Sequence, residues 1–171
     1  AQRHDPLIDQ QLKHIPPYLR DLLYQCSSRY VETPGTYLDL VYILLSDHPH
    51  QILFLILNYD NLLEQALTGR DSSMTFTSID SYVDPERVAL VVKLHGSINW
   101  YSQLSNRDGA DSSRWDNLVR KMDLNRRPAD RDLLIVDDIP NVRRHHRMLY
   151  PVMTAPLARK DPASFTCPPT H

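Results

Sequence analysis

Glycine is scarce in this chain, with four residues in a sequence of 171: Gly35, Gly69, Gly96 and Gly109. No two of them lie close enough in sequence to form the glycine-rich loop that binds the phosphates of a nucleotide. If the protein binds a nucleotide, we expect its phosphate-binding loop to lie outside this sequence. We therefore interpret the chain as an incomplete piece of a larger domain.

Cysteine pairs, a one-sided charge and long apolar runs are also missing. Cys26 and Cys167 could form one disulfide. Two cysteines do not make the disulfide framework of a secreted protein, and they do not supply the paired thiols of a structural zinc site. The formal net charge of −2 lacks the positive excess that favours nucleic acid or an anionic membrane. The longest apolar run, Ile52 to Leu57, is far below the ~20 residues of a membrane span. No signal peptide is visible, and we expect a cytoplasmic protein without membrane partners.

The length fits one domain, because a chain of this size buries roughly 70% of its unfolded surface. We expect a single domain over residues 1–171, with core motifs in 51–101, a variable polar insertion over about 102–147 and an irregular tail over 154–171. Residues 114–147 contain nine Lys or Arg against six Asp or Glu, and this interleaving favours a solvated surface over a nucleic-acid site.

Two apolar segments of strand length give the clearest structural pattern. Residues 51–57 and 87–94 have no polar face, which is typical of interior strands in a parallel sheet covered by helices. Between them, a helical period begins at Leu62 and ends at Gly69, a candidate C′ glycine. The order strand, helix, strand predicts an α/β fold with a parallel sheet.

Weaker patterns surround this core. We expect helices over 16–30, 36–46 and 116–122, and short strands over 133–136 and 148–153. Leu19, Leu22 and Leu23 are interpreted as a core-facing stripe, and Trp100 and Trp115 as packing residues. His48 and His50 fit a polar loop better than a metal site, and His145 and His146 lack companion ligands.

Polar residues follow both predicted strands. Asn58 and Asp60 come after the first strand and His95 after the second, 37 residues beyond Asn58. That separation allows one crossover connection, so an amide, a carboxylate and an imidazole are predicted to converge at the carboxyl edge of one sheet, where open parallel sheets bind ligands. Asn and Asp are also common turn and N-cap residues, so spacing alone leaves a purely structural role open.

The residues themselves resemble a known family. Residues 58–64 read Asn-Tyr-Asp-Asn-Leu-Leu-Glu, and residues 93–100 read Lys-Leu-His-Gly-Ser-Ile-Asn-Trp. This pair of motifs, in this order, resembles the sirtuin-like family in the branch found in bacterial defence proteins. The resemblance covers roughly Ile52 to Trp100, and it implies a Rossmann-like parallel sheet with flanking helices, here as a partial sirtuin-like domain.

The resemblance also implies roles for individual residues. Asn58 matches the asparagine that contacts the nicotinamide-side ribose and helps to place the attacking water, and His95 matches the general base toward a ribose hydroxyl. An imidazole suits this role because it is largely neutral, yet basic, at neutral pH. Asp60 would lie near the nicotinamide, Gly96 would allow close approach of the backbone to the ligand, and Tyr59 and Ser97 would shape the pocket.

The function implied is NAD hydrolysis to nicotinamide and ADP-ribose by the effector domain of a prokaryotic antiviral defence protein. NAD is then the substrate, no metal is expected, and partners are a homo-oligomer or a fused or associated sensor. Ile56 and Leu57 stand where relatives carry Thr or Gln, which motivates an alternative, a non-catalytic NAD- or ADP-ribose-binding sensor or assembly domain. A protein deacylase or ADP-ribosyltransferase is a third reading, although the deacylases' zinc module with its two cysteine pairs is missing.

Overall fold

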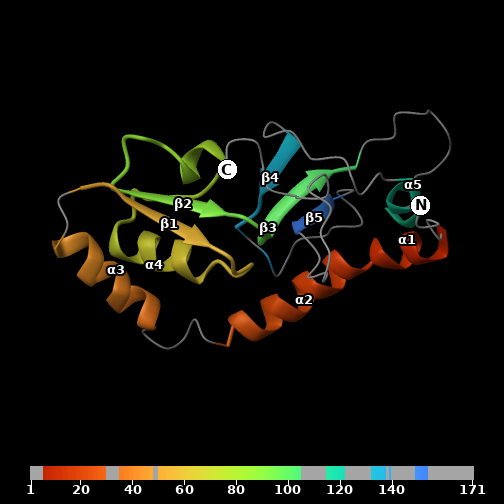
Figure 1. The fold of residues 1–171 in the computed structure, drawn as a ribbon, viewed down its shortest axis with the longest axis horizontal. Coiled ribbons are helices and arrows are strands. Elements are labelled where there is room, and N and C mark those ends of the chain that lie inside the picture. Colours follow the sequence, from red (N-terminus) through yellow and green to blue (C-terminus); the bar gives the residue numbers. More distant parts are fainter. Residues whose placement is uncertain are drawn as a thin grey trace, which may run out of the picture.

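The computed structural model describes residues 6–29, 35–47, 50–104, 115–121, 132–137, 139 and 149–153. Within them the chain forms two small sheets with helices packed along one side (Figure 1). In chain order the elements are α1 (Pro6–Leu12), α2 (Ile15–Ser27), α3 (Thr36–Asp47), β1 (Ile52–Ile56), α4 (Leu62–Arg70), the 3-10 turn η1 (Asp80–Tyr82), β2 (Ala89–Lys93), β3 (Gly96–Gln103), α5 (Trp115–Lys121), β4 (Leu133–Ile135) and β5 (Leu149–Met153).

The first sheet is the parallel pair of β1 and β2. Its register runs from Ile52 opposite Ala89 to Ile56 opposite Lys93. Helix α4 lies in the connection between the two strands, as the apolar runs and the helical period between them predicted. The sequence-based prediction of a mixed α/β fold with parallel pairing is therefore confirmed for these elements.

Helices α3 and α4 cover one face of this pair (Figure 1). Phe54 and Val91 point into the core, where they join the buried α4 residue Leu67. On the other face Leu53 and Leu55 are each 60% exposed. We expected β1 to be covered on both faces, and this is wrong. Among the described residues, helices pack only against the face of β1 that carries Phe54.

The second sheet is antiparallel, in the order β4-β3-β5. The short strands β4 and β5 were predicted, but the long central strand β3 was not. Residues 96–103 mix glycine, serine and asparagine with aromatics, so they contain no apolar run of strand length. Even so, the first six residues of β3 are buried, because β4, β5 and helix α2 surround them.

The helix predictions are confirmed for α2, α3 and α5, while α1 was not predicted. Two details differ from expectation. Gly69 lies inside α4, which continues to Arg70, so it is not a terminating glycine. On α2, Leu19 and Leu23 pack against the core but Leu22 is exposed, so the apolar stripe is narrower than predicted.

The tryptophans behave as predicted, since both Trp100 and Trp115 are buried. His48, His145, His146 and Cys167 lie outside the described residues, as do the tail over 154–171 and much of the polar insertion. Among the helices that the structure describes, none combines the length and apolar character needed to cross a membrane.

Candidate functional site

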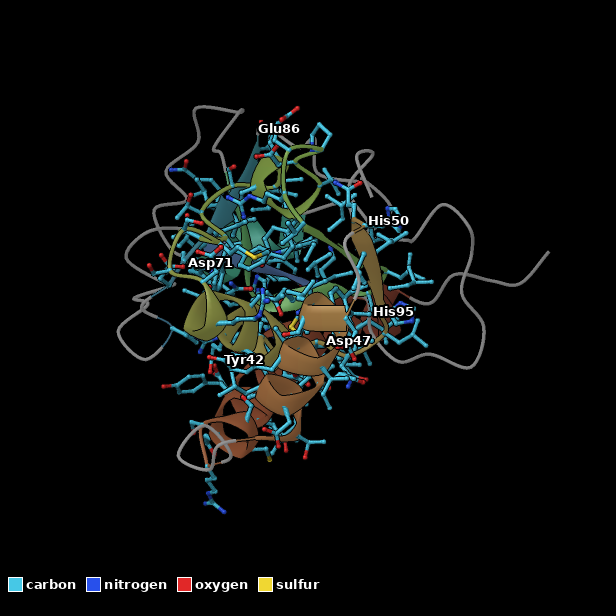
Figure 2. The ribbon with its side chains drawn as sticks, turned by 90° about the vertical axis from the view of Figure 1, so that its left-hand side faces the viewer. Tyr42, Asp47, His50, Asp71, Glu86 and His95 are labelled. Carbon is cyan, nitrogen blue, oxygen red and sulfur yellow. The ribbon has the colours of Figure 1, made fainter. Side chains whose placement is uncertain are left out.

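Two motif segments leave the same edge of the parallel sheet. Because Ile56 pairs with Lys93 in a parallel register, the chain passes the sheet edge at the same level after both strands. Asn58 follows β1 by two residues, and His95 follows β2 by two residues. Figure 2 labels His95 at one end of the β1 ribbon and His50 at the other. The backbone therefore brings the Asn58 segment and the His95 segment to the same edge of the sheet, as predicted.

Hydrogen bonds at one carbonyl join the two segments. The Tyr59 carbonyl accepts from the Ile98 amide at 2.9 Å and from the Ser97 hydroxyl at 3.2 Å. The Tyr59 ring also lies beside the His95 ring, with centroids 6.1 Å apart. The turn after β1 and the start of β3 therefore form one unit, with Tyr59 and Ser97 at its centre.

Asn58 is exposed and has one described contact, with helix α3. Its amide nitrogen lies 3.5 Å from the hydroxyl oxygen of Tyr37, to which it donates. An exposed carboxamide beside a hydroxyl offers donors and an acceptor to a ligand that has several hydroxyl groups, such as a ribose. His95 is half-buried at the junction of the two sheets, so its ring is held while part of it stays accessible.

Asp60 has a structural task that the sequence did not reveal. One of its carboxylate oxygens accepts from the Leu62 amide at 3.2 Å, at the start of α4. A side-chain acceptor at this point satisfies an amide that has no partner within the helix. The role of Asp60 near a nicotinamide stays a prediction, and its carboxylate already fixes where the turn ends and the helix begins.

The Tyr59 hydroxyl carries its proton at neutral pH, as a tyrosine ordinarily does, and burial raises its pKa further. The phenol therefore presents a neutral group that can donate and accept hydrogen bonds beside His95. This suits a residue that shapes a pocket.

The backbone of strand β5 leaves no room for a side chain at position 96. Its φ angle is +80°, a left-handed value that favours glycine. A Cβ at this position would lie 2.0 Å from the carbonyl oxygen of Val152. The close approach of backbone to backbone at β3 and β5 accounts for the glycine, and a contact of Gly96 with a ligand stays a prediction.

Sequence reasoning missed a buried ion pair beneath the turn. Lys93, on the inward face of β2, has its ammonium nitrogen 2.8 Å from a carboxylate oxygen of Glu64 on α4, and the two side chains are 0% and 5% exposed. The same ammonium donates to the Asp60 carbonyl. Little in the sequence signals this pair, because a charged residue at the end of a strand or in the first turn of a helix usually faces solvent.

A hydrogen-bonded chain continues from this pair into the core. The Tyr82 hydroxyl donates to Glu64 at 3.3 Å and accepts from the Trp100 indole nitrogen at 3.2 Å. Burial, and then the negative charge of Glu64, holds the pKa of Tyr82 well above its usual value. Within the described residues, the second carboxylate oxygen of Glu64 has no hydrogen-bond partner.

The described part of the chain brings together no group of three His, Cys, Asp or Glu side chains suited to a metal ion. It does supply, at one sheet edge, an exposed amide, a half-buried imidazole and a neutral phenol. Such groups bind and orient a polyhydroxylated ligand, and the imidazole can exchange a proton with it.

Comparison with known proteins gives one family. The family model described as "SIR2-like domain" matches residues 53–126, a stretch that contains both motif segments. The match supports a sirtuin-like domain with an NAD-related function, because SIR2-like domains use NAD and are generally enzymatic. No curated protein and no solved structure matches the chain.

Proposed function

We propose that the chain carries the active site of a sirtuin-like NAD glycohydrolase, which cleaves NAD into nicotinamide and ADP-ribose. Asn58 and His95 are its catalytic pair, and Tyr59, Asp60, Gly96 and Ser97 complete the NAD-contacting set. One observation carries the proposal. The SIR2-like match spans two segments that leave neighbouring parallel strands at the same edge and are hydrogen-bonded to each other through the Tyr59 carbonyl.

The proposed chemistry uses groups that this edge supplies. Departure of nicotinamide leaves positive charge on the ribose carbon, and oriented dipoles in a partly dry site stabilise such charge better than water does. The Asn58 amide binds the ribose and places the incoming water. His95 takes a proton from a ribose hydroxyl, for which an imidazole is well suited at neutral pH.

Substitution of the catalytic pair tests this proposal. Asn58→Ala and His95→Ala, made in the complete protein, are each expected to reduce nicotinamide release to a small residual rate, while far-ultraviolet circular dichroism and the melting temperature stay near wild type. His50→Ala is the matched control, because His50 is an exposed histidine at the opposite end of β1 (Figure 2). Unchanged NAD loss in both Ala variants of the pair would refute the assignment.

A second candidate function is a non-catalytic domain that binds NAD or ADP-ribose for sensing or assembly. It is favoured by Ile56 and Leu57, which stand where relatives of the motif carry Thr or Gln. Leu57 is 59% exposed directly beside Asn58, so it offers apolar surface where those relatives carry a polar side chain. Calorimetry that detects binding of ADP-ribose, together with no cleavage of NAD by the complete protein, would select this candidate.

We propose further that β1 and β2 belong to a Rossmann-like sheet within a single domain over residues 1–171. Their parallel register and the helix α4 between them support this arrangement. The biological setting proposed is a prokaryotic antiviral defence protein, acting as an oligomer or with a sensor module. Infection of cells that express the protein should then lower their NAD content, and His95→Ala should prevent that loss.

A further inference from the structure

The turn that carries Asn58 is fixed at two successive carbonyl groups. The Tyr59 carbonyl is held from β3 by the Ser97 hydroxyl and the Ile98 amide. The next carbonyl, that of Asp60, is held from below by the ammonium group of Lys93. Two anchors that approach from different strands leave the peptide planes of this turn little freedom to rotate.

Lys93 reaches that carbonyl from inside the protein core. Its side chain is fully buried, and the carboxylate of Glu64 neutralises it at 2.8 Å. A buried ion pair adds little net stability, and apolar residues of similar volume often replace one without loss. Fold stability alone therefore does not explain a lysine at this position. Its hydrogen bond to Asp60 differs, because no apolar side chain can supply it.

We propose that Lys93 is a positioning residue, which holds the Asn58–Asp60 turn in the geometry that the proposed NAD-cleaving site requires. This inference rests on the proposed function, which it deepens. Glu64 supplies the counter-charge that allows an ammonium group to be buried beneath the turn. The Tyr82 hydroxyl, which accepts from the Trp100 indole, donates to the same carboxylate oxygen of Glu64 that pairs with Lys93.

The test separates positioning from stability with two variants. Lys93→Met/Glu64→Gln replaces both buried charges by neutral side chains of similar length and leaves Tyr82 an acceptor, so its melting temperature should stay near wild type. Tyr82→Phe is the control: it removes the buried hydroxyl that accepts from the Trp100 indole and donates to Glu64, but it does not touch the Asp60 carbonyl. The control should therefore lower the melting temperature.

The two variants should show opposite patterns. In Lys93→Met/Glu64→Gln we expect kcat for nicotinamide release to fall about 100-fold, the size of effect that small misplacements of reacting groups produce. Hydrogen exchange at the Leu62 and Ile98 amides, which bond to the turn, should become faster. In Tyr82→Phe, kcat and the exchange of both amides should match the wild type despite the lower melting temperature.

Three results would overturn the inference. They are wild-type exchange at both amides in the double variant, a loss of kcat in Tyr82→Phe equal to that in the double variant, and a double variant that does not fold. Should the wild-type protein not cleave NAD, the proposed function fails alone. The exchange measurement then still decides whether Lys93 holds the turn.

Discussion

Gly96→Ala should destabilise the protein, because the added Cβ would clash with the backbone of strand β5. The left-handed φ of +80° costs an alanine about 1–2 kcal/mol. Its Cβ would stand 2.0 Å from the Val152 carbonyl oxygen, so β3 and β5 must separate locally. Overpacking of this kind typically costs about 1–3 kcal/mol. The sum is about 2–5 kcal/mol, a large part of the ~5–15 kcal/mol that holds a domain folded.

Gly69→Ala is the matched control for this prediction. Gly69 lies inside α4, and the nearest atom to an added Cβ is a Leu38 methyl carbon at 3.9 Å, an ordinary contact. Because alanine favours the helix, this variant should gain about 0.5–1 kcal/mol. The same substitution should therefore have opposite signs at two sites in one chain.

Urea unfolding followed by circular dichroism measures both free energies. Gly96→Ala should also reduce nicotinamide release, since moving residue 96 displaces the neighbouring His95. A loss of stability below about 1 kcal/mol, against the ~1–2 kcal/mol expected from φ alone, would refute the reasoning. So would equal effects of the two glycine substitutions.

Three further predictions concern stability. Burial raises the pKa of Tyr82, so the folded protein holds this proton more firmly than the unfolded chain does. The resulting contribution to the free energy of unfolding is full below pH 10 and is lost as the pH rises above it. In alkaline solution the free energy of unfolding of Tyr82→Phe should therefore fall with pH less steeply than that of the wild type, by about 1.4 kcal/mol per pH unit. Leu67→Ala should cost about 2–5 kcal/mol in chemical unfolding, whereas Leu55→Ala, at an exposed site, should stay within about 0.5 kcal/mol. Asp60→Ala removes the acceptor of the Leu62 amide and should lower unfolding free energy by about 1 kcal/mol, with Asp60→Asn closer to wild type.

The parallel core could be predicted because its signals are local. The runs over residues 52–57 and 88–92 are apolar without interruption, and a helical period separates them, so strand order and direction followed from a few general rules. The meeting of the Asn58 and His95 segments followed in turn, because neighbouring parallel strands end at one edge.

The features that could not be predicted from the sequence depend on contacts between residues that are far apart in the chain. Strand β3 is buried by β5, whose residues begin about 50 positions later, and its own composition gives no apolar run. The Lys93–Glu64 pair was missed for a similar reason. Each charge alone looks like an exposed residue, and only the packing of α4 on β2 brings the two together.

Gly96 shows how one residue type admits two explanations. The sequence suggested that a ligand approaches its backbone, and the structure supplies a nearer cause in the Val152 carbonyl. Asp60 is comparable, since the motif suggested a ligand contact and the structure adds the bond to the Leu62 amide. Residues at the end of a strand often serve the turn itself, which is why spacing alone underdetermines a site.

The central claim is that Asn58 and His95 act on one substrate in one site. Nicotinamide release by Asn58→Ala, His95→Ala and the double variant tests it most directly. Groups that act together in one step lose activity non-additively, so the double variant should be no slower than the slower single variant. Losses that multiply in the double variant, as they do for independent sites, would contradict the claim.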